Sequence, residues 1–122
     1  MKTSIVKTKG FRAGTPALDR YPASLRELVS QIVGAVRPLR ITLFGSRARG
    51  DARLESDYDL AVIMPDGAHR RHTSQKIHRQ VLVMELDYDI LVATQGDLEK
   101  YGSHPSLIYK YILEEGVDLY VA

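Results

Sequence analysis

The stretch from Ile41 to Ile63 constrains this chain more than any other part of the sequence. It holds two apolar runs, 41–44 and 60–63, each long enough for a buried β-strand. Gly45 ends the first run and Ser46 follows it, a pair typical of a sharp turn. We therefore expect two strands of one sheet, with a glycine turn directly after the first.

Two aspartates lead into the second strand. Asp57 and Asp59 are two residues apart, so their side chains project to the same face of a strand. Carboxylates held side by side repel each other, which raises a pKa or requires a cation. Magnesium is the usual cation for oxygen ligands beside phosphate.

The turn supplies the complementary feature. Gly45-Ser46 precedes an arginine-rich segment, 46–52, that we expect to form a short turn of helix. Backbone N–H groups at such a turn bind phosphate well. A phosphate-binding turn beside a metal-binding carboxylate pair indicates nucleotide chemistry.

A third acidic position lies on a later segment, 81–94, which we predict to be one long strand. One predicted face is apolar and belongs to the core: Leu82, Met84, Leu86, Tyr88, Ile90 and Val92. Glu85, Asp87 and Asp89 lie on the other face. We favour Asp89 as the third metal ligand because it directly precedes an apolar run, with Asp87 as the alternative.

The other predicted elements cover this sheet. Apolar residues recur every three or four positions after Pro22 and predict an amphipathic helix that ends at Arg37-Pro38. The sequence also predicts helices over 68–80 and 95–101, a helix opened by Pro105 and ended by Gly116, and strands over 40–44 and 58–64. Residues 117–121 are predicted to form a short last strand or an extended tail. This order indicates a small α/β sheet covered by helices.

The predicted helix 68–80 is polar on nearly every side and has Ile77 as its clear apolar anchor. We interpret it as a solvated face, or one that meets a charged ligand or partner. Its histidines at 69, 72 and 78 have no nearby acidic or thiolate partner and do not favour a metal site. Lys76 and Arg79 are secondary candidates for contact with a triphosphate.

Composition limits the class of protein. With 122 residues, 44% of them hydrophobic and 26% charged, the chain resembles an ordinary single globular domain. The sequence has no cysteine, no apolar run that could cross a bilayer and no signal-peptide pattern, so we expect a cytoplasmic protein. These features exclude disulfide scaffolds and thiolate zinc sites.

The charge is uneven along the chain. Residues 1–20 carry five basic and one acidic side chain, a net charge of +4, whereas the remaining 102 residues carry 12 basic and 14 acidic side chains, a net charge of −2. We interpret 1–20 as a basic, irregular N-terminal arm and 21–122 as the domain. A nucleic-acid signal is confined to the arm.

The sequence LFGSRARGDARLESDYDLAVI resembles the signature of the minimal nucleotidyltransferase (MNT) family, within the DNA polymerase β-like nucleotidyltransferase superfamily. In that signature Gly-Ser is followed after ten residues by Asp-x-Asp, as at Gly45-Ser46 and Asp57-Tyr58-Asp59. The third acid of the family matches Asp89-Ile90-Leu91-Val92, and the closing EEGVDLY also resembles the family. The resemblance covers about residues 22–121.

The resemblance implies a mixed sheet covered by helices and a two-metal transfer of a nucleotide from ATP. Asp57 and Asp59 would bind the nucleotide-side Mg²⁺, and Asp89 would complete a second Mg²⁺ site and help remove the proton of the acceptor. Gly45 and Ser46 would bind the triphosphate. Arg47 and Arg49 follow the turn, where either contacts the phosphates or packs over the turn.

The acceptor is expected from outside the domain, because the chain lacks the additional domains of larger relatives; a partner or a second copy would supply it. Related members act as antitoxins on a HEPN-type RNase, by moving AMP to one of its tyrosines or by binding it. We therefore expect a protein adenylyltransferase, EC 2.7.7 type. The alternatives are a non-catalytic binding module and nucleotidyl transfer to a small molecule.

Overall fold

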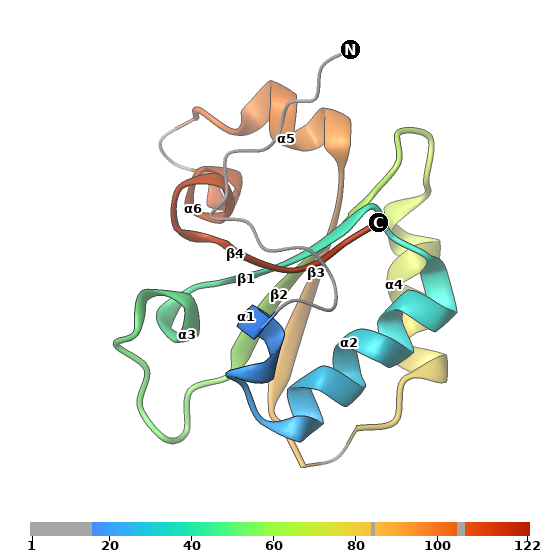
Figure 1. Cartoon of the computed structure of the whole chain (residues 1–122). Helices are drawn as coiled ribbons and strands as arrows, with labels where there is room; N and C mark the ends of the chain where they lie inside the picture. Colours follow the sequence, from blue (N-terminus) through green and yellow to red (C-terminus); the bar gives the residue numbers. More distant parts are fainter. Residues whose placement is uncertain (1–15, 84, 105–106) are drawn as a thin grey trace.

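The computed structural model describes residues 16–83, 85–104 and 107–122. Ten helices and strands follow one another in these residues (Figure 1). They are α1 (Pro16–Asp19), α2 (Ala23–Val36), β1 (Arg40–Phe44), α3 (Ser46–Arg49), β2 (Tyr58–Met64), α4 (Arg70–Gln80), β3 (Tyr88–Thr94), α5 (Gln95–Tyr101), α6 (Ile108–Glu115) and β4 (Val117–Val121).

The four strands form one mixed sheet in the order β3-β2-β1-β4. β1 is antiparallel to both of its neighbours, whereas β2 and β3 are parallel. A parallel pair needs a crossover connection, and α4 supplies it between β2 and β3. The expected small mixed sheet covered by helices is confirmed. In the described part of the chain, no helix is long and apolar enough to span a membrane.

Helices cover both faces of the sheet. α2 and α4 lie on one face, and α5 and α6 lie on the other (Figure 1). Alternation along β2 divides its buried residues between the two cores: Leu60 and Val62 pack with α2 and α4, while Ala61 and Ile63 pack with α5 and α6. Burial on both faces explains why this strand is almost continuously apolar.

The predicted helix after Pro22 is α2, which buries Leu25, Leu28 and Ile32 completely. It ends at Arg37, whose φ of 49° places it in the left-handed region and whose N–H donates to the Val33 carbonyl. Pro38 then prevents the helix from continuing, as expected.

β4 is joined to β1 by a buried polar cluster that the sequence analysis did not identify. Asp118 is 2% exposed and accepts hydrogen bonds from the Thr42 hydroxyl and an Arg40 Nη, both at 2.9 Å. Because a buried charge needs an opposite charge and hydrogen-bond donors, these contacts allow an aspartate to be buried on the edge strand β4.

The predicted long strand over 81–94 is wrong in its first half, since β3 begins only at Tyr88. The Val81 N–H still donates to the Ile77 carbonyl at the end of α4, and the Leu82 N–H donates to the Gln31 side chain. Val81 and Val83 are buried and Leu82 is 77% exposed, so the expected inward face is reversed here.

Smaller differences occur at other ends. α4 begins at Arg70 rather than Ala68, and the helical turn expected over 46–52 ends at Arg49. Gly50, with φ of 89°, terminates that turn. The arm was expected to be irregular, but Pro16–Asp19 forms a turn of helix; its residues 1–15, and Pro105 at the predicted start of the last helix, lie outside the described residues.

Candidate active site

Gly45 forms the turn between β1 and α3 in a conformation that only glycine adopts readily, with φ of 79° and ψ of −157°. Its carbonyl accepts hydrogen bonds from the N–H groups of Ala48 and Arg49, both at 3.0 Å. A Cβ atom added to Gly45 would lie 2.5 Å from Oδ2 of Asp59. The turn therefore brings bare backbone directly against an acidic side chain.

The register of the parallel pair places two of the predicted carboxylates side by side. Asp59 on β2 is the direct partner of Asp89 on β3. Asp59 is two residues before Ala61 and Asp89 is four residues before Ala93, and both alanines pack against α5 and α6. Because residues an even number of positions apart on a strand point to the same face, the two aspartates lie on the α5 and α6 face of the sheet. Asp57 precedes β2 by one residue and keeps the same alternation. The fold brings together three acids that are up to 32 residues apart in sequence.

The carboxylate of Asp59 is held in an unfavourable charge environment. Its pKa is raised above the ordinary value, first by partial burial and then by the negative charges of Asp89 and Asp57; the Arg49 guanidinium opposes this shift. A cation between the three carboxylates would relieve both effects. The pKa of Asp59 thus supports the expectation drawn from the Asp-x-Asp spacing.

The donor set fits Mg²⁺, because it consists of carboxylate oxygens beside a turn that accommodates phosphate. Among the described residues, no three histidine, aspartate or glutamate side chains form a ready-made metal cluster. Asp59 and Asp89 are nevertheless aligned in register and their charges interact.

Asp87, the alternative third ligand, lies before β3 and is exposed. Its carbonyl accepts the Tyr58 N–H at 2.9 Å, so Asp87 lies beside the start of β2. Asp89 is the acid whose charge acts on Asp59, and Asp87 is not among the causes of that pKa shift. The geometry therefore favours Asp89 as the partner of Asp59.

Arg47, a predicted phosphate contact, is occupied by the loop between α3 and β2. Its guanidinium donates to the Ser56 carbonyl from Nε at 3.2 Å and from Nη2 at 2.9 Å, and to the Leu54 carbonyl from Nη2 at 3.1 Å. It also lies 4.5 Å from the centre of the Tyr58 ring. Arg47 thus packs on the loop before β2, whereas the sequence left open only a phosphate contact or packing over the Gly45-Ser46 turn.

Arg49 lies closer to the acidic site, since its charge lowers the pKa of Asp59. It forms ion pairs with Asp51 at 3.2 Å and with Glu115 on α6 at 3.1 Å. Glu115 is a neighbour of the site that the sequence did not predict. The EEGVDLY segment contained that residue, but no spacing rule connects it with Arg49, 66 residues away.

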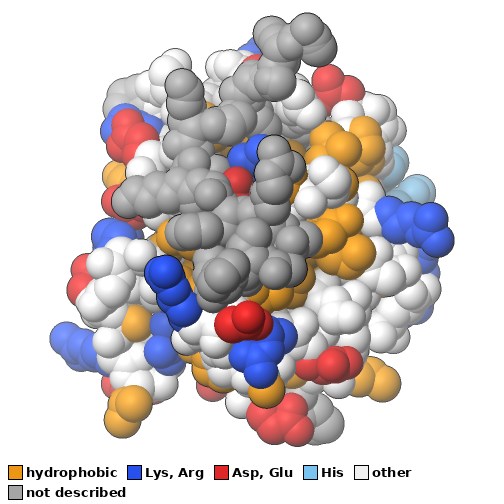
Figure 2. Space-filling view, viewed as in Figure 1, with side chains coloured by type: hydrophobic (Ala, Val, Ile, Leu, Met, Phe, Trp, Pro, Cys, Tyr) orange, Lys and Arg blue, Asp and Glu red, His pale blue; other side chains and the backbone are white. Residues whose placement is uncertain are grey.

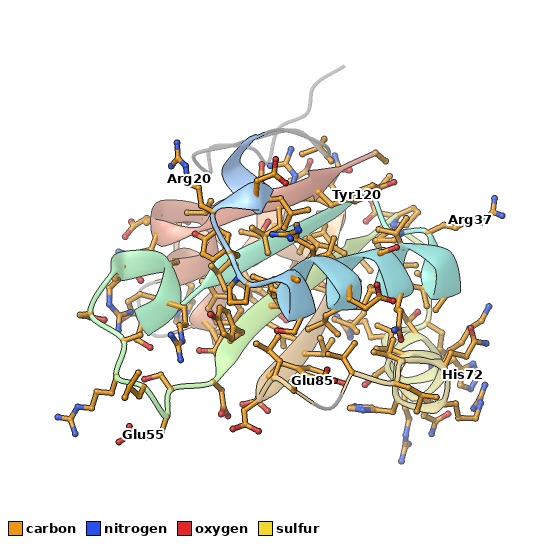
Figure 3. All side chains as sticks on the ribbon, turned by 60° about the horizontal axis from the view of Figure 1, so that its bottom comes forward. Arg20, Arg37, Glu55, His72, Glu85 and Tyr120 are labelled. Atoms are coloured by element: carbon orange, nitrogen blue, oxygen red, sulfur yellow. The ribbon has the colours of Figure 1, made fainter. Side chains whose placement is uncertain are left out.

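α4 lies on the opposite face of the sheet from the carboxylates, because Ile77 packs with Leu60 and Val62. Its basic side chains and histidines are exposed, and blue and pale-blue side chains gather over it in Figure 2. Figure 3 shows His72 pointing away from the sheet. The His69 and His72 rings stack at 3.9 Å. Lys76 and Arg79 thus lie away from the acidic site, and α4 is a solvated face.

Comparisons with known proteins agree with this geometry. The sequence matches the nucleotidyltransferase domain family over residues 23–119. No curated protein is significantly similar in sequence.

Two solved structures share the fold. A proposed nucleotidyltransferase from Sulfolobus solfataricus is 18% identical with a TM-score of 0.60, and the match covers 86% of this chain and 84% of that one. A chain from the crystal structure of a toxin–antitoxin with AMP-PNP is 22% identical with a TM-score of 0.53, covering 80% of this chain and 73% of that one. The family match spans most of the chain, including the glycine turn and all three carboxylates, and this protein therefore belongs to the nucleotidyltransferase domain family.

Proposed function

We propose that this protein is a cytoplasmic, Mg²⁺-dependent protein adenylyltransferase that moves AMP from ATP to a tyrosine hydroxyl of a HEPN-type RNase partner, and so acts as an antitoxin. One observation carries the chemical part of this proposal. Asp59 and Asp89 are paired in register on parallel strands, with Asp57 on the same face and the Gly45 backbone against Asp59. This arrangement suits phosphoryl chemistry assisted by metal ions.

The three aspartates have distinct proposed roles. Asp57 and Asp59 would hold the nucleotide-side Mg²⁺, and Asp89 would complete a second site. When bound, the metal ions neutralise charge on the α-phosphate and on the departing pyrophosphate. Asp89 is exposed at the rim, where it accepts the proton of the hydroxyl as the new oxygen–phosphorus bond forms and pyrophosphate leaves.

The nucleotide is proposed to bind against the turn after β1. Gly45 permits close approach of the triphosphate, and the Ser46 hydroxyl has no hydrogen-bond partner among the described residues. Arg49 is 43% exposed and shared between two carboxylates, so one Nη group can turn to a phosphate. The AMP-PNP named with the toxin–antitoxin neighbour, an ATP analogue, supports ATP as the substrate.

The partner part of the proposal rests on two supports. Asp57 and Asp89 are exposed beside Asp59 at the start of β2 and β3, so an acceptor on another molecule can reach the acidic site. A toxin–antitoxin chain shares its fold, and the resemblance of the Gly45 to Ile63 region to MNT antitoxins suggests the HEPN class of partner. A protein tyrosine is an acceptor that can approach these exposed carboxylates.

The test is incubation of this protein with α-labelled ATP, Mg²⁺ and the proposed HEPN-type RNase partner. Label is expected on the partner, and it should disappear with Asp57→Asn. Glu55→Gln is the matched control, because Glu55 is exposed on the same loop and points away from the sheet (Figure 3). A stable complex without label would instead support a non-catalytic binding module. Label on small molecules alone would reject a protein acceptor.

A further inference from the structure

We propose that Arg47 is a positioning residue that restrains Ser56 and Tyr58, the two neighbours of Asp57, rather than a ligand of the triphosphate. The inference rests on the proposed function, because Asp57 matters only as a metal ligand. It changes the role that the sequence motif suggested for Arg47 and assigns phosphate contact to Arg49 alone.

The contacts of Arg47 enclose Asp57 along the chain. On the N-terminal side, two guanidinium nitrogens bind the Ser56 carbonyl at 2.9 and 3.2 Å. On the C-terminal side, the guanidinium lies 4.5 Å from the centre of the Tyr58 ring. Ser56 and Tyr58 are the direct neighbours of Asp57, so one side chain binds the peptide unit that precedes Asp57 and packs on the ring of the residue that follows it.

Tyr58 gives this restraint a rigid base. Its side chain is only 7% exposed and belongs to the core between the sheet and α2. Its N–H donates to the Asp87 carbonyl at 2.9 Å, where the pairing of β2 with β3 begins. The guanidinium therefore links a buried ring to an otherwise exposed loop.

The loop itself has few other restraints. Ser56 forms a local turn with Arg53: the Ser56 N–H donates to the Arg53 carbonyl, and the Ser56 hydroxyl accepts from the Arg53 N–H. Leu54 is 96% exposed and contributes only its carbonyl, to Arg47 at 3.1 Å. Asp51 is held separately, by its N–H to the Ser46 carbonyl and by its ion pair with Arg49, so loss of Arg47 would leave residues 52–57 attached mainly through this local turn.

The geometry requires arginine. Its planar, delocalised group binds two carbonyls and stacks on a ring at the same time, whereas lysine offers a point charge on a flexible stem. A phosphate contact would depend mainly on positive charge, which lysine retains. Arg47→Lys therefore separates a positioning role from a phosphate-binding role.

The experiment compares Arg47→Lys and Arg47→Ala with Arg53→Ala, a matched control that removes an exposed arginine of the same loop and keeps its backbone hydrogen bonds. We expect amide hydrogen exchange of the segment 51–58 to rise about tenfold in both Arg47 variants and to stay unchanged in the control. Contacts that support metal ligands change metal affinity by about 10–100-fold. We therefore expect both Arg47 variants to bind Mn²⁺, used in place of Mg²⁺, about 10–100-fold more weakly than the unmodified protein.

In the activity assay, both Arg47 variants should lower kcat about 10–100-fold and change KM for ATP less than about twofold. The proposal would be overturned by the opposite pattern: Arg47→Ala lowers the affinity for ATP in the absence of metal, Arg47→Lys restores that affinity, and hydrogen exchange is unchanged in both variants. Hydrogen exchange and Mn²⁺ binding need neither ATP nor a partner, so they test Arg47 even if the proposed function fails. If Arg47→Ala does not fold, Tyr58→Leu keeps an apolar core residue and must produce the same increase in loop exchange.

Discussion

Replacement of Gly45 by alanine tests whether the site depends on bare backbone at the turn. Gly45 has φ of 79° and ψ of −157°, a region that costs a residue with a side chain about 1–3 kcal/mol. The new Cβ would also lie 2.5 Å from Oδ2 of Asp59, so that carboxylate must move. Gly45→Ala should therefore lower the free energy of unfolding by about 1–3 kcal/mol, or roughly 4 °C in Tm per kcal/mol.

The effect on activity should exceed the effect on stability. A displacement of about 1 Å in a reacting or ligating group can reduce the rate about 100-fold. We expect at least that loss in AMP transfer at a temperature where Gly45→Ala is fully folded, together with weaker Mn²⁺ binding.

Gly34 is the matched control. It lies inside α2, and a Cβ atom there would meet nothing within 4 Å. Gly34→Ala should raise the free energy of unfolding by about 0.5–1 kcal/mol, because alanine is the better helix residue, and should leave transfer unchanged. Thermal unfolding and the labelled-ATP assay measure both variants. Full activity in Gly45→Ala would refute the argument that close approach at this turn positions Asp59.

Three further predictions concern charge. Asp59→Asn should abolish transfer yet raise the free energy of unfolding at pH 7 by up to about 1 kcal/mol. The reason is that the pKa of Asp59 is raised in the folded state, so ionisation of this carboxyl destabilises the protein as the pH rises above the ordinary value of 3.8. In denaturant titrations the gain in stability should therefore vanish below that pH. Asp97 has the opposite sign: partial burial opposes the shift, but hydrogen bonds from Thr94 and Arg70 lower its pKa, so its stabilising effect is present above pH 3.8 and is lost as the pH falls through the lowered value. Asp97→Ala should cost about 1 kcal/mol at pH 7 and nothing measurable in strong acid; an equal cost at both pH values would contradict the capping role. Asp118→Ala should cost about 3–5 kcal/mol in urea unfolding because it leaves Arg40 without its buried carboxylate, and a loss below 1 kcal/mol would show that this pair does not join β4 to β1.

Local patterns predicted the strands and helices whose signals agree at every level. β1, β2, α5 and β4 have the bounds that the sequence predicted, because each is an apolar or capped segment bounded by glycine, proline or a polar turn. The Asp57 and Asp59 pair was predicted for the same reason: a two-residue spacing at the start of a strand has one geometric outcome. Position along a strand was sufficient for these residues.

Alternation failed where hydrogen bonding changed the backbone. Residues 81–83 are apolar and resemble a strand, but the Val81 N–H completes the end of α4 and the Leu82 N–H binds Gln31 on α2. These two contacts rotate the segment, so Val81 and Val83 point inward and Leu82 outward. The pattern of residues 81–83 does not show that Gln31 will bind the Leu82 N–H. Alternation alone also does not determine whether the odd-numbered or the even-numbered residues of this connection face the core.

The sequence likewise does not show which groups the charged side chains around the site will contact. Arg47 and Arg49 are equivalent in the sequence, being two arginines on one short helical turn, yet one binds carbonyls beside Asp57 and the other pairs with Glu115 on α6. Their difference arises from what the fold places opposite each: a buried aromatic ring and free carbonyls for Arg47, carboxylates for Arg49. A basic residue next to a phosphate-binding turn therefore indicates phosphate contact only when nearer acceptors do not already use its donors.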